Sequence, residues 1–336
     1  MKGRRAPCAS PDPFALSEVA PEASVVAITC ATGFIGGAVA RRLAARGWLL
    51  RALVRGESRP EGLRRAGIEW VPGDLAQPEG LARLVDGARA VVHCAGAVRG
   101  LDDSDFRTAN VEGVFHLARA AANAHPAPLF VQLSSLAARE PGLSPYAASK
   151  RAGEEALASA GAGLRRVVLR PSAVYGPGDR EMRPLLRMMM RGLALAPGNG
   201  SGRFSLLFVD DLVAAVERLL HLDAAPEGPF ELHDGRPGGY SWPEAAGIAA
   251  RLRGRPVRLL SVPTALLAWA ARVNAARARL FGAVPMLTPG KVRELGHPDW
   301  VCDNAPFSAA TGWRPEVEFS EGLQRTLAPG TPEGGA

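Results

Sequence analysis

The stretch YAASK, residues 146–150, contains residue types that could move a proton. The chain has only three tyrosines and three lysines, yet Lys150 follows Tyr146 by four residues. On a helix, this spacing places both side chains on one face. A nearby ammonium favours the phenolate and lowers the tyrosine pKa, so the pair suits acid–base chemistry. The alternative is an ordinary pair of solvated side chains on a helix surface.

A glycine-bearing turn lies near the start of the chain, within ITCATGFIGGAVARRLAARG, residues 28–47. It follows one apolar run and begins one helical pattern. Gly33 and Gly36 lack side chains, so backbone N–H groups and the helix N-terminus could approach a pyrophosphate. The position between strand and helix favours a dinucleotide site over an ordinary glycine-rich turn.

The next polar positions bear on the identity of the dinucleotide. Arg55 ends the second predicted strand, 19 residues after Gly36. An acid there would hold the 2′-hydroxyl of the adenosine ribose, whereas an arginine favours a 2′-phosphate. NADP(H) is therefore the predicted cofactor, with NAD(H) as the alternative and a solvated strand-end arginine as the non-functional interpretation. Asp74, in GDL after the third strand, is predicted to face the adenine.

Short apolar runs alternate with helical patterns over the first 175 residues. The predicted strands are 24–30, 48–55, 68–73, 88–96, 128–135 and 164–172, and the helices between them include 36–46, 78–86, 107–124 and 146–160. Nearly continuous Val, Ile and Leu runs indicate parallel strands covered on both faces. We therefore predict an α/β fold with a Rossmann-type doubly wound parallel sheet, whose ligand crevice lies at the carboxyl ends of the strands.

The pattern changes after about residue 178, where Gly and Pro become frequent. A strand–helix unit returns at 204–220, and a strand follows at 229–235. We predict an NAD(P)-binding domain of residues 24–178 and 204–235. A smaller, mainly helical substrate domain is predicted from residues 179–203 and 236–328. Residues 1–23 and 329–336 are predicted to be a flexible leader and a flexible tail.

Composition excludes several function classes. The net charge of +7 is spread as isolated arginines without interleaved aromatics, so no nucleic-acid partner is predicted. Four cysteines without CxxC spacing predict neither a disulfide framework nor a metal site. No apolar run reaches the length of a membrane span and no signal peptide is visible, which predicts a cytoplasmic location. The partner is a small molecule; the oligomeric state stays open, with a homodimer as one option.

Taken in order, the motifs resemble those of the extended short-chain dehydrogenases/reductases, the NAD-dependent epimerase/dehydratase-like family. The segments that carry the resemblance are TCATGFIG, GDL, HCAG, NVEGVFHLARAA, the SS after the fifth strand, YAASK, LRPSAVYGPGD and FVDDL. They cover about residues 24–220, whereas the last third matches only loosely through GWRPEVEFSEGLQRT. One position departs from the family pattern: Cys30 stands where the glycine-rich turn normally begins with glycine.

The resemblance implies roles for individual residues. Tyr146 would exchange a proton with the substrate oxygen, and Lys150 would also hold the nicotinamide ribose. Ser135 matches the hydroxyl donor after the fifth strand. Asn110 is expected to orient the region around Lys150; the alternative is that Asn110 is a plain polar residue at the start of a helix. The implied cofactor contacts are Cys30, Thr32, Gly33, Phe34, Ile35, Gly36, Arg55, Asp74, Leu75, Cys94, Ala95, Gly96, Lys150, Pro171 and Val174.

Two further positions bear on the reaction. Dehydratases of the family carry an Asp-Glu pair where Leu136 and Ala137 stand, and nucleotide-sugar members usually carry Asn where Ala173 stands. RPSAVYGPGD resembles the 3β-hydroxysteroid dehydrogenase branch. We therefore predict an NAD(P)-dependent oxidoreductase that acts on a carbonyl/alcohol pair. A nucleotide-sugar epimerase, and a non-catalytic NAD(P)-binding sensor or assembly protein, remain alternatives, although non-catalytic relatives usually lose the Tyr/Lys pair.

Arg55 offers a test of cofactor preference. We expect the wild-type protein to bind NADP(H) more tightly than NAD(H), because the guanidinium pairs with the 2′-phosphate. The Arg55→Asp variant should lose this preference, since its carboxylate repels the phosphate. Titration of both cofactors against both proteins measures the effect, and tighter NAD(H) binding by the wild type would contradict the assignment.

Overall fold

The computed structural model describes residues 24–56, 63, 67–160, 163–282 and 287–328. The predicted leader, 1–23, and the predicted tail, 329–336, lie outside the described residues. Among the helices of the described residues, none has the length and apolar character needed to cross a membrane.

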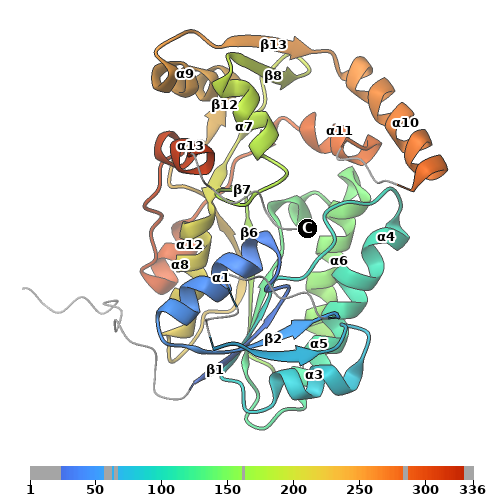
Figure 1. The fold of residues 1–336 in the computed structure, drawn as a ribbon, viewed down its shortest axis with the longest axis vertical. Coiled ribbons are helices and arrows are strands. Elements are labelled where there is room, and N and C mark those ends of the chain that lie inside the picture. Colours follow the sequence, from blue (N-terminus) through green and yellow to red (C-terminus); the bar gives the residue numbers. More distant parts are fainter. Residues whose placement is uncertain (1–23, 57–62, 64–66, 161–162, 283–286, 329–336) are drawn as a thin grey trace, which may run out of the picture.

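A seven-stranded parallel sheet forms the centre of the larger part of the molecule (Figure 1). Its order is β11-β6-β5-β4-β1-β2-β3. The strands are β1 (Val25–Thr29), β2 (Leu49–Val54), β3 (Glu69–Pro72), β4 (Ala90–His93), β5 (Leu129–Leu133), β6 (Arg166–Pro171) and β11 (Gly228–Leu232). The chain order reverses between β1 and β4, which is where such sheets bind ligands. The prediction of a Rossmann-type sheet is confirmed.

Helices cover both faces of this sheet. One face packs against α1 (Phe34–Ala45) and α8 (Val209–Leu220), and the other against α3 (Pro78–Val85), α5 (Gly113–Ala122) and α6 (Pro145–Ala160). Side chains alternate along a strand, so Val26 and Ile28 of β1 belong to the first core and Ala27 to the second. Two buried faces explain why the strand sequences are nearly continuously apolar.

The predicted helix 107–124 is interrupted. It consists of α4 (Asp103–Arg107), the π-helical turn η1 (Thr108–Glu112) and α5. A π-helical turn is rare and commonly marks a functional site. It places Asn110 in the middle of the helical segment, so the alternative interpretation of Asn110 as a plain polar residue at a helix start is wrong. Two short 3-10 turns, η2 (Leu136–Arg139) and η3 (Pro141–Leu143), lead from β5 to α6.

Small sheets join segments that are far apart in the sequence. β8 (Leu193–Pro197) pairs with β13 (Arg258–Val262), β9 (Arg203–Phe204) lies between β12 (Tyr240–Ser241) and β14 (Asp299–Trp300), and β7 (Ala173–Tyr175) pairs with β10 (Leu206–Phe208). The description of residues 236–328 as mainly helical therefore missed three strands. β12 and β14 have two residues each, too few for any alternating pattern to show.

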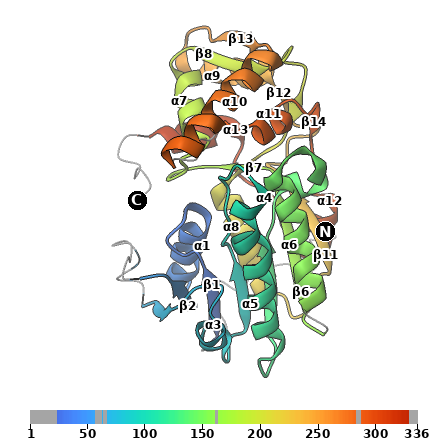
Figure 2. The same cartoon turned by 90° about the vertical axis from the view of Figure 1, so that its right-hand side faces the viewer.

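Most of the remaining helices gather beyond one end of the large sheet (Figure 2). They are α7 (Arg183–Met190), α9 (Trp242–Arg253), α10 (Thr264–Phe281), α11 (Pro289–Leu295) and α13 (Phe319–Leu327). In contrast, α12 (Ala305–Thr311) packs beside β11, where Phe307 belongs to the first core of the large sheet. A third core, built around the aromatic residues Tyr175, Phe208, Tyr240 and Phe319, holds α7, α9 and α13 against β7 and β10. The chain after β6 thus passes from the sheet directly into this smaller core.

An ion pair fixes α6 to the sheet. Arg170 of β6 donates from Nη2 to Glu154 Oε2 at 2.5 Å and from Nε to Oε1 at 2.9 Å, and the two side chains are 10% and 9% exposed. Ser134 Oγ donates to the same carboxylate at 2.5 Å. Because both side chains are buried, each charge needs the other to offset its loss of hydration, and removal of either partner should destabilise the fold.

This pair generates a prediction on stability. Glu154→Gln should lower the free energy of unfolding by about 3 kcal/mol, because it leaves the buried guanidinium of Arg170 without a countercharge. The adjacent Glu155 is exposed, so Glu155→Gln is a matched control with an expected change within about 0.5 kcal/mol. Urea unfolding of the three proteins measures both. Equal midpoints for the two variants would show that the pair is not structurally important.

Candidate functional site

The turn after β1 brings α1 very close to the strand end. Gly33 N donates to Cys30 O at 2.9 Å and closes the turn. A Cβ atom on Gly36 would lie 2.2 Å from Cys30 O, a distance that no side chain tolerates. The first N–H groups of α1, which have no partner within the helix, therefore stand at the switch point of the sheet. This arrangement fits the pyrophosphate of a dinucleotide.

Cys30 is strained within this turn. It is the only non-glycine among the described residues with a positive φ, 57°. Its Sγ lies 2.8 Å from the place that a Cβ on Gly33 would occupy, so the thiol fills the space over the turn. As predicted, Cys30 and Cys94 follow adjacent strands, β1 and β4. Burial raises the pKa of the Cys94 thiol.

The adenosine side of the turn carries an exposed arginine beside an aspartate. Arg55 follows β2 with its side chain 85% exposed, and its Nε lies 3.8 Å from Asp74 Oδ2. Asp74 accepts from the backbone N–H of Ala76 at 3.0 Å, which fixes the carboxylate. The neighbouring Leu75 packs against Gly113, where a Cβ atom would lie 2.8 Å from Leu75 Cδ1. The arginine can therefore swing toward an anion while Asp74 stays in place.

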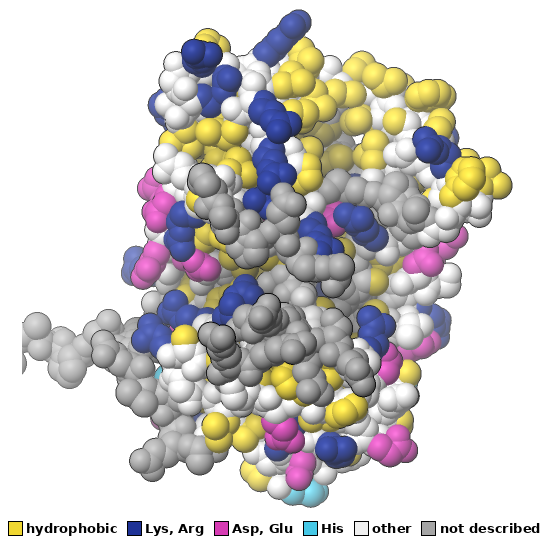
Figure 3. All heavy atoms as spheres, viewed as in Figure 1, with side chains coloured by type: hydrophobic (Ala, Val, Ile, Leu, Met, Phe, Trp, Pro, Cys, Tyr) yellow, Lys and Arg dark blue, Asp and Glu magenta, His cyan; other side chains and the backbone are white. Residues whose placement is uncertain are grey.

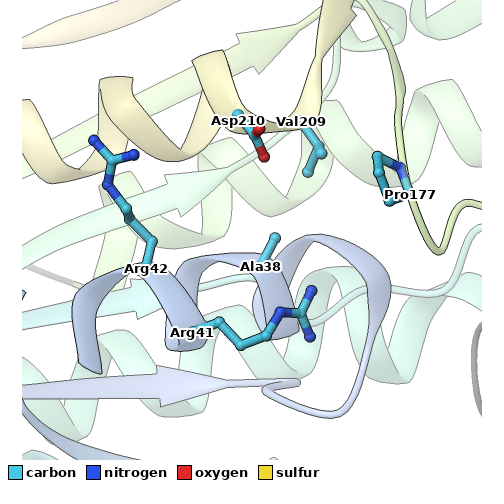
Figure 4. Close-up of a pocket in the computed structure, with 6 residues that line it drawn as sticks. All are labelled: Ala38, Arg41, Arg42, Pro177, Val209 and Asp210. Carbon is cyan, nitrogen blue, oxygen red and sulfur yellow. The ribbon is translucent and has the colours of Figure 1, made fainter. Parts of the chain in front are cut away.

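A cavity of about 360 Å³ lies between α1 and α8 (Figure 4). Its lining includes Arg41 and Arg42. Arg42 Nε donates to Glu217 Oε2 at 2.9 Å, whereas the Arg41 side chain extends along α1 toward the amino end of that helix (Figure 4). A Cβ on Gly37 would lie 3.3 Å from Arg41 Nη1. The sequence interpretation missed Arg41, although its spacing of four residues from Gly37 signals a shared helix face.

Asn110 joins the segment after β4 to α6. Its Oδ1 accepts from Ala97 N at 2.7 Å, and its Nδ2 donates to Ala97 O at 3.0 Å and to Ser149 Oγ at 2.8 Å. The backbone of the same residue requires a glycine opposite, since a Cβ on Gly153 would lie 2.2 Å from Asn110 O. The amide is 2% exposed, so this junction is a fixed part of the core.

Lys150 is buried within this junction. Its residue exposure is 8%, and Nζ donates to Leu133 O at 3.3 Å. A Cβ on Gly96 would lie 2.9 Å from Nζ, so glycine after β4 leaves room for the ammonium. Burial lowers the pKa of Lys150 to about 8, while the Glu154 carboxylate acts in the opposite direction. The group therefore changes charge close to physiological pH.

Tyr146 differs from the sequence expectation. Burial raises its pKa to about 12, while a hydrogen bond with the Ser135 side chain acts in the opposite direction. Lys150 Nζ lies 5.9 Å from the Tyr146 ring centre, and the pKa of the phenol is raised although this ammonium is near. The expected depression of the tyrosine pKa is therefore wrong for this structure. A protonated Tyr146 beside Ser135 can instead donate a proton to a carbonyl oxygen.

Two contacts around the site were not foreseen. Thr29 Oγ1 accepts from Cys94 N and Ala95 N at 3.1 Å and bonds His93 Nδ1 at 3.0 Å, which orders the segment after β4. Burial lowers the pKa of His93 to about 3, so the imidazole is neutral. At the start of α6, Ser144 Oγ caps Ala147 N at 2.9 Å and bonds Glu294 of α11. Neither contact has a local sequence signal.

The structure thus places the predicted residues in two groups. Asn110, Ser135, Tyr146, Lys150 and the segment Cys94–Gly96 gather at the carboxyl ends of β4 and β5. The second group surrounds the turn and the edge of the sheet, and consists of Cys30, Thr32, Gly33, Phe34, Ile35, Gly36, Arg55, Asp74 and Leu75. Pro171 ends β6 next to β5, and Val174 lies in β7.

Comparison with known proteins accounts for this combination. Residues 26–230 match the NAD dependent epimerase/dehydratase family. The chain belongs to this family. The prediction of an NAD(P)-dependent enzyme is thereby confirmed.

Two relatives cover most of the chain. A ceramide reductase from Caulobacter vibrioides (strain NA1000 / CB15N) is 39% identical over 286 residues, which are 84% of this chain and 88% of the relative. A 2-alkyl-3-oxoalkanoate reductase from Stenotrophomonas maltophilia (strain K279a) is 30% identical over 337 residues, 90% of this chain and 98% of the relative.

Solved structures agree on the fold. A putative epimerase from Burkholderia cenocepacia J2315 has a TM-score of 0.70 at 22% identity and covers 91% of this chain and 97% of its own. A UDP-glucuronic acid 4-epimerase from Bacillus cereus in complex with NAD has a TM-score of 0.68 at 17% identity, with coverage of 90% and 96%. Structural neighbours thus bind NAD at this fold.

Cys30 gives a test of the turn. Cys30→Gly should bind NADP(H) more tightly than the wild type, because the thiol no longer narrows the space over Gly33. It should also relieve backbone strain of about 1–2 kcal/mol. Cys30→Ala is the matched control, since it removes the sulfur but keeps a Cβ at positive φ. Cofactor titration and urea unfolding separate the two effects; equal or weaker binding by Cys30→Gly would contradict the assignment.

Proposed function

We propose that this protein reduces a ketone carried by a long-chain lipid, with NADPH as reductant and Tyr146 as proton donor. The observation that carries the proposal is the hydrogen-bonded pair of Tyr146 and Ser135 beside the buried Lys150. All three lie at the carboxyl edge of the sheet, where the turn before α1 presents its N–H groups. Proton donor and cofactor site therefore share one crevice.

The reaction divides between cofactor and protein. A reduced nicotinamide bound at the turn before α1 would supply the hydride for the carbonyl carbon. Ser135 and Tyr146 hold the carbonyl oxygen, and the phenol transfers its proton there, so the ketone becomes a secondary alcohol. Lys150 supplies a positive charge that stabilises the resulting phenolate and, by resemblance to the family, holds the nicotinamide ribose. The high pKa of Tyr146 suits this direction, because the phenol is protonated at neutral pH.

The relatives support the substrate class. One is named for ceramide, a long-chain amide, and the other for 2-alkyl-3-oxoalkanoates, which are ketones with alkyl substituents. Both names describe reductases of molecules that carry hydrocarbon chains. Leu136 and Ala137 supply no acid or base for dehydration, and Ala173 supplies no amide for a sugar diphosphate. A lipid ketone is therefore favoured over a nucleotide sugar.

The exposed guanidinium of Arg55 at the end of β2 supports NADP(H) over NAD(H), because an arginine at this position can pair with a ribose 2′-phosphate. The cytoplasmic location remains a prediction of the sequence, and the oligomeric state stays open, with a homodimer as one option.

Tyrosine variants test the chemistry. Tyr146→Phe should lower the rate of NADPH oxidation with a 3-oxo lipid amide by about 10²–10⁴-fold while leaving NADPH affinity within about twofold, because the phenol acts on the substrate. Tyr175→Phe is the matched control: the buried Tyr175 hydroxyl has no hydrogen-bond partner among the described residues, so its loss should leave the rate unchanged.

The same assay distinguishes the substrate classes. NADPH consumption is measured with a 3-oxo lipid amide and with a 2-alkyl-3-oxoalkanoate. Conversion of UDP-glucuronic acid in the presence of NAD is followed by product analysis, because epimerisation consumes no net reductant. The proposal expects turnover with the lipid ketones. Conversion of the nucleotide sugar alone, or unchanged turnover in Tyr146→Phe, would contradict it.

A further inference from the structure

Helix α10 exposes an apolar stripe on the outside of the smaller part. Leu266, Trp269, Val273 and Leu280 are 54%, 63%, 39% and 78% exposed. Their spacings of three, four and seven residues put them on one helix face. Figure 3 shows hydrophobic side chains gathered over this region, which is the upper right of Figure 1.

The opposite face of α10 fixes the orientation of the helix. Its buried residues are Ala271, Ala275 and Ala278, and α10 packs mainly on α11. Asn274 Nδ2 also bonds Leu287 O at 3.5 Å. The small residues of α10 thus face the protein, and its large apolar side chains face outward. A helix that packs on a hydrophobic core has the opposite arrangement, with its large apolar side chains facing inward. Contiguous exposed apolar surface of this kind marks an interaction site.

Arginines border the stripe on both sides. Arg272 and Arg279, seven residues apart, share one flank, and Arg277 lies on the other. The helix contains no acidic residue. Arg279 contacts Asp102 at 3.5 Å, whereas Arg272 and Arg277 have no ion pair within the part of the chain that the structure describes.

We propose that α10 docks this protein on an anionic lipid membrane. The apolar stripe would enter the boundary between headgroups and acyl chains, the indole of Trp269 would lie at that boundary, and the flanking guanidinium groups would pair with lipid phosphates. A second copy of the chain fits less well. Twofold packing of this face on itself would set the arginines of both copies side by side.

The position of α10 connects this surface to the site. The contact between Arg279 and Asp102 puts the carboxyl end of α10 beside the start of α4. Asp102 lies in the segment that begins at Gly96 and Ala97, where Asn110 and Lys150 are held. The membrane surface would therefore lie next to the site entrance. The docking proposal is argued from α10 alone and does not rest on the lipid substrate, although it suits one.

Vesicle co-sedimentation tests the proposal. The full chain is mixed with phosphatidylcholine vesicles or with vesicles that also contain phosphatidylglycerol. Binding should be stronger to the anionic vesicles and should weaken with added salt. The triple variant Leu266→Ser/Trp269→Ser/Leu280→Ser should bind at least about tenfold more weakly. Arg272→Gln/Arg277→Gln should lose only the preference for anionic vesicles. Leu49→Ser, which alters a 50% exposed leucine on β2, is the control and should bind as the wild type does.

Two further measurements keep the outcomes separate. NADPH affinity of each variant reports an intact fold without requiring turnover, so failure of the proposed ketone reduction would not affect the docking result. Analytical ultracentrifugation reports self-association. The proposal is overturned if the wild type does not bind anionic vesicles or if the triple variant binds them as strongly as the wild type. It is also overturned if the triple substitution converts a dimer into a monomer, because a second copy of the chain would then be the partner of α10.

Discussion

The burial of the Lys150 ammonium is the constraint on which the rest of the site depends. A charged amine loses hydration when it leaves water, and burial accordingly lowers the pKa of Lys150 to about 8. A hydrogen-bond acceptor and free space around Nζ offset this loss of hydration. Leu133 O accepts a hydrogen bond, and Gly96 has no side chain where one would collide with Nζ. Burial also raises the pKa of Tyr146 to about 12, so the phenol carries its proton at neutral pH.

Contacts from three parts of the chain fix α6, the helix that carries Lys150. Asn110, in its π-helical turn, bonds the segment after β4 and the Ser149 side chain of α6. Gly153 lets α6 approach the Asn110 carbonyl. From the far end of the chain, Glu294 bonds Ser144 where α6 begins. The smaller part of the molecule therefore contacts the start of the helix that carries Tyr146 and Lys150. A substrate bound to the smaller part would thus be coupled to the position of these two residues.

Sequence alone predicted the features that chemistry ties to a fixed spacing. Gly33 and Gly36 can be recognised because a pyrophosphate needs backbone without side chains between a strand and a helix. Tyr146 and Lys150 can be recognised because one helical turn separates them. Other features depend on three-dimensional enclosure. The shift of the Tyr146 pKa is upward once burial is included, opposite to the shift predicted from the nearby lysine. The π-helical turn at Asn110 leaves no periodic pattern in the sequence. The contact between Ser144 and Glu294 joins residues 150 positions apart. The two-residue strands β12 and β14 exist only through their pairing with β9.

The ionisation of Lys150 is the most direct measurement of this account. The chain contains only Lys2, Lys150 and Lys291, so a protein labelled with [ε-13C]lysine gives three resonances, and Lys150→Arg assigns the one of interest. The account predicts that the Lys150 resonance titrates near pH 8. Titration of this resonance near the ordinary lysine value of about 10.4 would contradict it, because Lys150 would then be a solvated surface residue.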